Sequence, residues 1–444
     1  MLYKSLKNKK YIASFKEAVL FGQSPDKGLY FPEKIPLLEK KFFKNISNFE
    51  GNDLMMEVIK PFIGNEIPYK ELLNIISNTV NFKINLKKIY ENFFSLELFL
   101  GPTMAFKDIG VKFLSGCIKY FCKQIKKNII ILTATSGDTG AAVANAFNKI
   151  DGVKVVILYP SSKISFLQEK QITTLGDNIL ALEIKGNFDD CQLLAKKAFY
   201  DEKIRKKLFL TSANSINIAR LLSQIFYYFL CYKLLFKKKN NEKIIFSIPS
   251  GNFGNICAGL IAFKMGLPVK HFIAATNIND TVPRLLKSEI YNPYPTKETI
   301  SNAMDIADPN NFSRIMYMFK HVKNIKKIFS AYSFSDQETI NIIKFIWEKY
   351  KYMMDPHGAI GYLGLKKFYF DKKNLNYKNI LNIFLATASP VKFLEKINKK
   401  LSDQILLNEK VKKLLKKTKK SIKLSNEYEN FKNWLLTSNL DYKR

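Results

Sequence analysis

Residues 129–148 read IIILTATSGDTGAAVANAFN, and this stretch predicts a buried strand that is followed directly by a helix. Residues 129–133 form an apolar run of the kind found in parallel strands that are covered on both faces. Residues 141–148 are rich in alanine and favour a helix, and the Ser, Thr and Asp side chains before them can cap its first turn. A strand, a short loop and a helix in this order form the repeating unit of α/β proteins.

Apolar runs of this kind continue along the chain from about residue 96 and alternate with amphipathic segments. Five more of them are predicted as buried strands, at 153–159, 179–184, 244–248, 272–275 and 380–385. A chain of 444 residues is longer than a single core usually supports. We therefore predict a mainly helical N-terminal domain over residues 1–95 and two α/β domains over 96–240 and 241–444, with the second boundary in the polar run KKKNNE (237–242).

The formal net charge of +33 is the most unusual bulk property of the chain, because 71 basic residues face only 38 acidic ones. Such an excess is common in proteins that bind nucleic acids or anionic membranes. Only five of the basic residues are Arg, however, and Arg is the residue that recognises bases and phosphates in a bidentate way. The abundant Lys, Asn, Ile, Phe and Tyr share A/T-rich codons, so we interpret the charge as a compositional bias. We expect no nucleic-acid partner, and a basic nucleic-acid-binding protein is the alternative from another functional class.

The remaining bulk features argue against a membrane, a metal site and a disulfide framework. The apolar stretch 221–236 contains polar residues and is shorter than the ~20 residues that span a bilayer, so we expect a buried helix. The first residues lack the apolar segment of a secretory signal, which favours the cytoplasm. Five Cys at unrelated spacings and three His favour reduced thiols and no metal ion. The Lys-rich stretch 402–424 is interpreted as a solvated helix face, with a nucleic-acid or membrane patch as the alternative.

Glycine is scarce in this chain, at 19 of 444 residues, so its clusters are informative. One cluster lies in TATSGDTG (133–140) and another in PSGNFGN (249–255), and both follow a predicted strand and precede a helix. Free N–H groups in such loops suit a phosphate or a carboxylate, whereas the alternative is a capped turn without a ligand. The spacing matches neither a dinucleotide fingerprint nor a P-loop. Two anion loops at the ends of strands predict a cleft for a phosphorylated small molecule.

Lys107 lies among apolar residues in FLGPTMAFKD (99–108). A lysine in an apolar pocket has a lowered pKa and can act as an amine nucleophile, as in Schiff-base chemistry. The alternative is a lysine that pairs with Asp108 and takes no part in chemistry.

A series of long motifs resembles the threonine synthase family. In chain order they are FLGPTMAFKD (99–108), TATSGDTG (133–140), KISFLQEKQITTLG (163–176), GNFDDCQ (186–192), SANSINIARLL (212–222), PSGNFGN (249–255) and ATNINDTVPR (275–284). The resemblance is dense from about residue 28 to 387 and is weaker at both ends. It implies the tryptophan-synthase-β-like fold of type II pyridoxal-phosphate enzymes. It also implies a carbon–oxygen lyase that converts O-phospho-L-homoserine and water to L-threonine and phosphate, the last step of threonine biosynthesis, and it favours a monomer.

The same resemblance assigns roles to the motif residues. Lys107 matches the lysine that holds pyridoxal 5'-phosphate as a Schiff base, and its freed amine would then move protons on the substrate. Thr387 matches the hydroxyl residue that faces the pyridine nitrogen. The cofactor phosphate would be bound by Gly251, Asn252, Phe253, Gly254 and Asn255. The substrate carboxylate would be held by Ser136, Gly137, Asp138 and Thr139.

Arg220 is our first candidate for binding the substrate phosphate, because a retained Arg is informative in a chain with so few of them. Ser162, Lys163 and Asn214 are its expected helpers. Arg284 and Arg314 are the next candidates, and a structural ion pair is the alternative role for Arg220.

Three positions depart from the family pattern. Leu100 and Ser389 stand where the family commonly has His, and Asn255 stands where it commonly has Asp. The motif lysine, glycine loop and threonine are all retained, so we expect the chain to be active. A threonine or serine dehydratase-like lyase of the same fold is the alternative, and the N-terminal extension and KISFLQEKQ argue against it.

Overall fold

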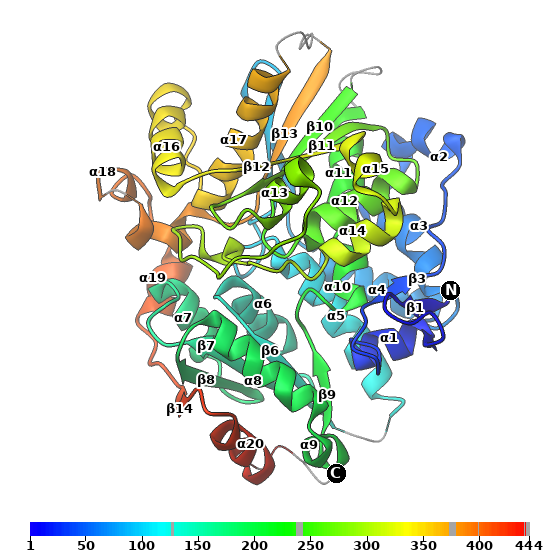
Figure 1. Cartoon of the computed structure of the whole chain (residues 1–444), viewed down its shortest axis with the longest axis vertical. Helices are drawn as coiled ribbons and strands as arrows, with labels where there is room; N and C mark the ends of the chain where they lie inside the picture. The colour runs from blue at the N-terminus through cyan, green and yellow to red at the C-terminus, as the bar shows by residue number, and fades with distance from the viewer. Residues whose placement is uncertain (126–127, 237–242, 373–378, 398, 439, 441–444) are drawn as a thin grey trace.

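Two sheets with helices on both faces form the body of the computed structural model (Figure 1), which describes residues 1–125, 128–236, 243–372, 379–397, 399–438 and 440. The first sheet is wholly parallel, with the order β14 (Ile422–Ser425), β8 (Ile179–Lys185), β7 (Val153–Pro160), β6 (Ile129–Ala134) and β9 (Phe209–Ser212). The second has the order β12 (Phe329–Ser333), β11 (Val269–Thr276), β10 (Lys243–Pro249), β13 (Ile380–Ala386), β5 (Phe93–Glu97) and β4 (Asn85–Tyr90), and only its β4–β5 pair is antiparallel.

The α/β prediction is confirmed, and all six predicted strands are present as β6, β7, β8, β10, β11 and β13. These strands are almost completely buried, which is why their sequences are nearly uninterrupted apolar runs. Strands β4, β5, β9, β12 and β14 were not predicted, because they are short or partly exposed and their sequences mix polar and apolar residues.

The largest apolar core lies between the two sheets. It is built around five helices, α5 (Lys107–Cys122), α6 (Asp138–Phe147), α10 (Ile218–Ser223), α11 (Ile225–Phe236) and α12 (Gly254–Lys264). A second core joins the outer face of the first sheet to α8 (Phe188–Tyr200) and α20 (Tyr428–Thr437). A third joins the outer face of the second sheet to α16 (Asp336–Tyr350) and α17 (Pro356–Asp371). The inner core places the ends of β6, β10 and β13 near one another.

The N-terminal segment is mainly helical, as predicted. It contains α1 (Phe15–Phe21), α2 (Lys40–Lys44), η1 (Ile46–Asn48), α3 (Gly51–Ile63) and α4 (Tyr69–Thr79), together with an unpredicted small antiparallel sheet of β2 (Ile12–Ala13), β1 (Tyr3–Ser5) and β3 (Tyr30–Pro32). Strand β5 spans position 95 and belongs to the second sheet, and 237–242 lie outside the described residues. The division into three domains therefore stays a prediction.

The remaining helical segments are short. They are α7 (Phe166–Thr173), α9 (Glu202–Lys207), α13 (Thr281–Ser288), η2 (Asn302–Met304), α14 (Phe312–Phe319), α15 (Val322–Lys326), η3 (Pro390–Lys396), α18 (Lys399–Ser402) and α19 (Glu409–Leu415).

Two segment predictions need correction. The apolar stretch 221–236 forms no single helix, because α10 ends at Ser223 and α11 begins at Ile225. The Lys-rich stretch is helical only in α19, and 422–425 form the edge strand β14 because their backbone pairs with β8. Within the part of the chain that the structure describes, no helix has both the length and the apolar character needed to cross a bilayer.

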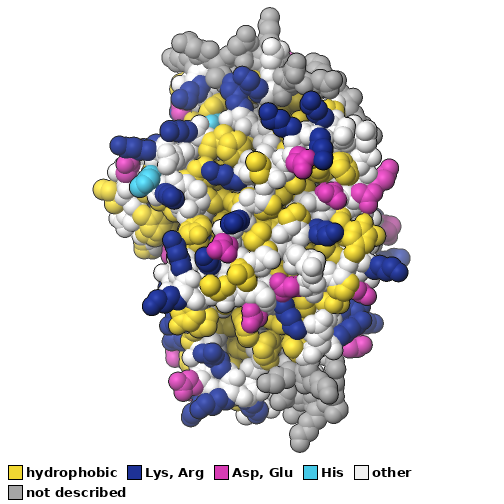
Figure 2. All heavy atoms as spheres, turned by 90° about the vertical axis from the view of Figure 1, so that its right-hand side faces the viewer, with side chains coloured by type: hydrophobic (Ala, Val, Ile, Leu, Met, Phe, Trp, Pro, Cys, Tyr) yellow, Lys and Arg dark blue, Asp and Glu magenta, His cyan; other side chains and the backbone are white. Residues whose placement is uncertain are grey.

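One face of the molecule shows how the basic side chains are distributed. On the face shown in Figure 2, Lys and Arg side chains are scattered among acidic and apolar ones and gather in no single patch. The absence of a nucleic-acid partner stays a prediction.

All five Cys are buried and none of them forms a disulfide among the described residues, in agreement with the expected reduced thiols. Burial raises the pKa of Cys257 to about 12 and raises the pKa of Cys117, Cys191 and Cys231 further, which suppresses the reactive thiolate. We expect a colorimetric thiol reagent to leave the native chain unmodified and to titrate five thiols after unfolding. Rapid modification of the native chain at any of the five would contradict this arrangement.

Candidate active site

Lys107 is the first residue of α5, and its position is fixed by the end of β13. The N–H of Phe106 donates to the carbonyl of Thr387 at 2.8 Å, and Ala105 forms an antiparallel bridge with Ala388. Lys107 and Thr387, which are far apart in the sequence, are thereby brought to the wall of one pocket.

This pocket lies between the two sheets and contains most of the predicted site residues. Its wall includes the predicted Lys107, Ser136, Asp138, Thr139, Asn214, Arg220, Gly251, Asn252, Phe253, Gly254, Asn255 and Thr387. Gly137, Ser162 and Lys163 do not line it. Ser162 is exposed, and Lys163 is an exposed residue whose ammonium pairs with Glu298 at 2.8 Å, so the structure does not place either helper beside Arg220.

The Lys107 side chain is only 13% exposed and has an unusual electrostatic setting. Burial lowers the pKa of Lys107 to about 8. The Asp138 carboxylate, 3.9 Å away, opposes this shift, and the positive charges of Arg220 and Lys392 add to it. Asp108 is directed elsewhere, since its carboxylate accepts from the Thr103 N–H at 2.9 Å and from the Thr103 hydroxyl at 2.5 Å. Lys107 can therefore supply an unprotonated amine near neutral pH.

The loop 249–255 has the shape of an anion cradle. A Cβ at Gly251 would meet the Ala303 carbonyl oxygen and the Met304 Cα at 2.8 Å, so only glycine fits there. Phe253 has a φ of 58° and directs the chain into α12, whose first N–H groups lack partners within the helix.

The departure at Asn255 has a structural explanation in this loop. The Asn255 amide donates to the Pro249 carbonyl at 2.7 Å and closes the loop on itself. A carboxylate in that position could not donate this hydrogen bond.

The loop 133–140 is partly a capped turn. The Thr135 hydroxyl accepts from the N–H groups of Gly137 at 3.0 Å and Gly140 at 2.8 Å. Gly137 has a φ of 127°, and a Cβ there would collide with Gln168. The Asp138 side chain is held by Gln168 and by Lys392. Since a carboxylate repels another carboxylate, the Asp138 side chain is unsuited to bind the substrate carboxylate directly.

Arg220 is a buried cation that no carboxylate of the described residues neutralises. It is 3% exposed, one of its amino groups donates to the Ala213 carbonyl at 2.6 Å, and its Nε has no partner in the described part of the chain. Burial lowers the pKa of Arg220 to about 10, and the side chain remains charged at neutral pH. The ion-pair alternative for Arg220 is therefore not what the structure shows, and the guanidinium is available to an anion in the pocket.

The other two Arg candidates lie outside the pocket wall. Arg314 is fully buried and donates to the carbonyls of Tyr30 and Ile216 at 2.9 and 2.7 Å. Arg284 pairs with Asp280 at 2.8 Å and stacks on Tyr294. Both have structural contacts that occupy their guanidinium groups.

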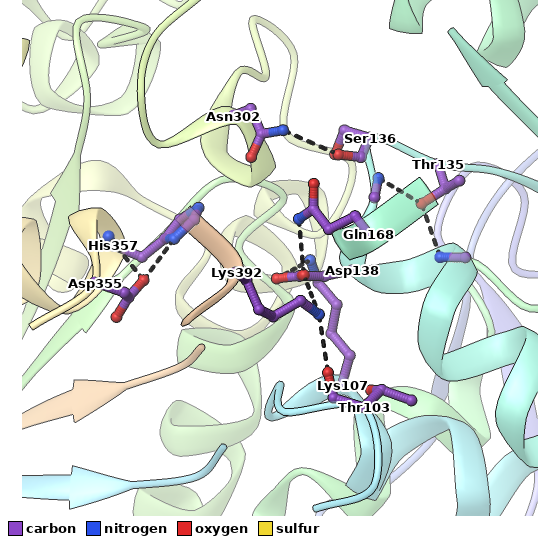
Figure 3. A network of polar contacts seen from close by, with 12 residues as sticks. Thr103, Lys107, Thr135, Ser136, Asp138, Gln168, Asn302, Asp355, His357 and Lys392 are labelled. Atoms are coloured by element: carbon purple, nitrogen blue, oxygen red, sulfur yellow. Dashed lines mark hydrogen bonds and ion pairs between the residues drawn. The ribbon is translucent and has the colours of Figure 1, made fainter. Parts of the chain in front are cut away.

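Sequence reasoning missed several polar residues around the pocket. His357 lies in the first turn of α17 beside Asp355, which accepts from the His357 Nδ1 at 2.7 Å, while the His357 Nε2 has no partner among the described residues (Figure 3). An Asp-Pro-His sequence before a helix, in a chain with three His, could have indicated it. Lys392 gave no such signal, because it is one of many lysines.

Two of the family departures lie away from the pocket wall. Leu100 is 43% exposed and lines no part of it. Ser389 is buried, and its N–H donates to the Met104 carbonyl at 3.0 Å.

Comparison with known proteins agrees with this geometry. Residues 84–384 match the family described as pyridoxal-phosphate-dependent enzymes, and residues 2–80 match the threonine synthase N terminus. A threonine synthase of Buchnera aphidicola is 42% identical over 97% of this chain and 99% of that relative. The chain belongs to the threonine synthase family. The crystal structure of the Escherichia coli threonine synthase superposes with a TM-score of 0.91 at 38% identity, covering 98% of this chain and 99% of that one.

The threonine synthase fold and its dependence on pyridoxal phosphate are thus established for this chain. A solved threonine synthase from Brucella melitensis with bound pyridoxal phosphate has a TM-score of 0.90 at 31% identity, covering 98% of each chain. The residues of the pocket fit this cofactor. They supply a largely buried amine for its aldehyde, a loop with no room for a Cβ at Gly251, and the buried nitrogens of Arg220 and His357 that lack partners in the described part of the chain. The individual roles of these residues stay predictions.

Proposed function

We propose that the pocket around Lys107 binds O-phospho-L-homoserine and converts it, with water, to L-threonine and phosphate. One observation carries this proposal: the amine of Lys107, the glycine cradle at 251–254 and the unneutralised Arg220 share a single pocket wall. An amine and two separate anion sites are what an aldehyde cofactor with a phosphate and a phosphorylated amino acid require.

Bound pyridoxal phosphate supplies an electron sink that stabilises negative charge next to the amino group of the substrate. In our assignment, Lys107 would hold its aldehyde, residues 251–255 its phosphate, and the Thr387 hydroxyl its ring nitrogen. A neutral hydroxyl at that nitrogen makes the ring less electron-withdrawing than a carboxylate partner would.

The reaction requires protons to move at Cα, Cβ and Cγ as phosphate leaves Cγ and the water oxygen adds at Cβ. We assign these transfers to the Lys107 Nζ, because its lowered pKa makes the unprotonated amine accessible near neutral pH. Arg220 would hold the phosphate that departs, and Asn214 lies on the same wall. The backbone of residues 136–139 would hold the substrate carboxylate.

The remaining assignments concern the setting of the enzyme. We propose a monomer located in the cytoplasm that acts on a small molecule and binds no nucleic acid. The scattered distribution of Lys on the face shown in Figure 2 supports the absence of a nucleic-acid partner, and the buried Cys without disulfides support the cytoplasm.

The function is tested by giving the cofactor-loaded chain O-phospho-L-homoserine and measuring phosphate and threonine together. We expect the two products in equal amounts and no ammonia from L-serine or L-threonine. Release of ammonia and a keto acid in place of threonine would favour the dehydratase-like alternative and would contradict the proposal.

A further inference from the structure

Lys392 is a completely buried lysine next to the pocket. It lies in η3, which follows β13 and Thr387, and its side chain is 0% exposed. Its Nζ lies 2.6 Å from the Asp138 Oδ1 and donates to the Thr103 carbonyl at 2.9 Å (Figure 3). It does not line the pocket, so it cannot touch the substrate directly.

Asp138 is shared between two lysines. Its Oδ2 lies 3.9 Å from the Lys107 Nζ, and its Oδ1 also accepts from the Gln168 amide at 2.9 Å. Burial alone would raise the pKa of Asp138, but the charges of Lys392, Lys107 and His357 outweigh burial and lower it. One permanently ionised carboxylate therefore faces two ammonium groups and binds the Lys392 ammonium at the shorter distance.

This arrangement matters because Lys107 must lose its proton before it can react with an aldehyde. A buried carboxylate with no other partner would stabilise the ammonium form of Lys107. The nearby Lys392 compensates the charge of Asp138 and adds a repulsive positive charge of its own.

We propose that Lys392 is a positioning residue that neutralises the charge of Asp138 and thereby keeps the Lys107 amine unprotonated. Without Lys392, the Asp138 carboxylate would stabilise the protonated form of Lys107. The inference rests on the proposed role of Lys107 in holding the cofactor. Lys392 acts through Asp138, and the pair also ties the end of β13 to the start of α6.

The charged groups around Lys107 come from three packed elements. Asp138 from α6 raises the pKa of Lys107, whereas Arg220 from α10 and Lys392 from η3 lower it. Removing Lys392 therefore leaves the carboxylate uncompensated, and the pKa of Lys107 must rise. Removing Asp138 must lower it.

The test measures the protonation of Lys107 in the full-length chain by its rate of acylation as a function of pH, followed by peptide mass spectrometry. We expect Lys392→Met to raise the midpoint for Lys107 by about one pH unit or more and Asp138→Asn to lower it. The matched control is Lys432→Met on α20, which removes the 2.7 Å ion pair between Lys432 and Asp201 away from the pocket and must leave the Lys107 midpoint unchanged.

A double variant keeps the test decisive where Lys392→Met destabilises the fold by leaving a buried carboxylate unpaired. Lys392→Met with Asp138→Asn removes both charges, and its Lys107 midpoint must lie close to that of Asp138→Asn alone, because Lys392 acts through Asp138. A midpoint one pH unit or more above that of Asp138→Asn, or an unchanged midpoint in folded Lys392→Met, would overturn the proposal.

Capture of pyridoxal phosphate gives a second readout that does not depend on turnover. In Lys392→Met, capture must be slowed most below the new midpoint and must recover as the pH rises. A purely structural role predicts equal slowing at every pH. Because neither measurement uses the substrate, an error in the proposed substrate leaves both results interpretable.

Discussion

Replacement of Lys107 by alanine is expected to reduce phosphate release from O-phospho-L-homoserine by at least about 10³-fold, because both the covalent anchor and the proton-transferring amine are lost. The variant should still bind pyridoxal phosphate weakly through the glycine cradle. Reduction with borohydride should leave the cofactor on Lys107 in the wild type and on no residue of the pocket in the variant.

The matched control for this prediction is Lys112→Ala. Lys112 lies one and a half turns further along α5, is half-buried, and donates to Asn81 rather than to the pocket. It should retain the wild-type rate and the label on Lys107. Full activity of Lys107→Ala, or a label on another lysine, would remove the basis of the assignment.

Replacement of Arg220 by methionine is expected to lower kcat/KM for O-phospho-L-homoserine by about 30- to 1000-fold, since a buried contact between a guanidinium and a doubly charged phosphate is worth about 2–4 kcal/mol. The same variant should have an unchanged or higher Tm. In the free chain the guanidinium is buried with one hydrogen bond to Ala213 and without a carboxylate, and methionine removes that desolvation cost.

Opposite changes in activity and stability distinguish binding from a structural role. Arg284→Met is the matched control, because Arg284 pairs with Asp280 outside the pocket wall, and it should keep the wild-type kcat/KM. A large drop in Tm for Arg220→Met with an unchanged kcat/KM would instead make Arg220 a structural residue.

The part of the site that could be predicted from the sequence is the part with rare residue types or long motifs. Scarce glycines indicated the loops at 133–140 and 249–255, and the scarcity of Arg directed attention to Arg220. These signals can be read from local sequence, because each loop directly follows a predicted strand in the chain. They indicated the two anion loops, whereas the role of Lys107 came from the long motif that resembles the threonine synthase family.

The contacts between segments could not be predicted in this way. The pairing of Lys392 with Asp138 joins η3 to α6, and the sequence contains no mark that distinguishes this lysine from its many neighbours. Ser162 and Lys163 are exposed and do not line the pocket, and the Lys163 ammonium pairs with Glu298, so their role as helpers of Arg220 stays a prediction. The edge strand β14 was predicted as helix, because an amphipathic Lys-rich pattern contains no information about its pairing with the distant strand β8.

The edge strands of the two sheets have a consequence for how the chain reaches its structure. The β4–β5 hairpin precedes every strand of the first sheet, yet β5 pairs with β13, and β14 pairs with β8 long after β8 has been synthesised. Neither sheet is encoded by one continuous stretch, and the first sheet still lacks β14 when residue 386 completes the strands of the second. The open edge of β8 is exposed on the ribosome until residues 422–425 emerge, which makes such late, non-local pairing slow and prone to association between nascent chains.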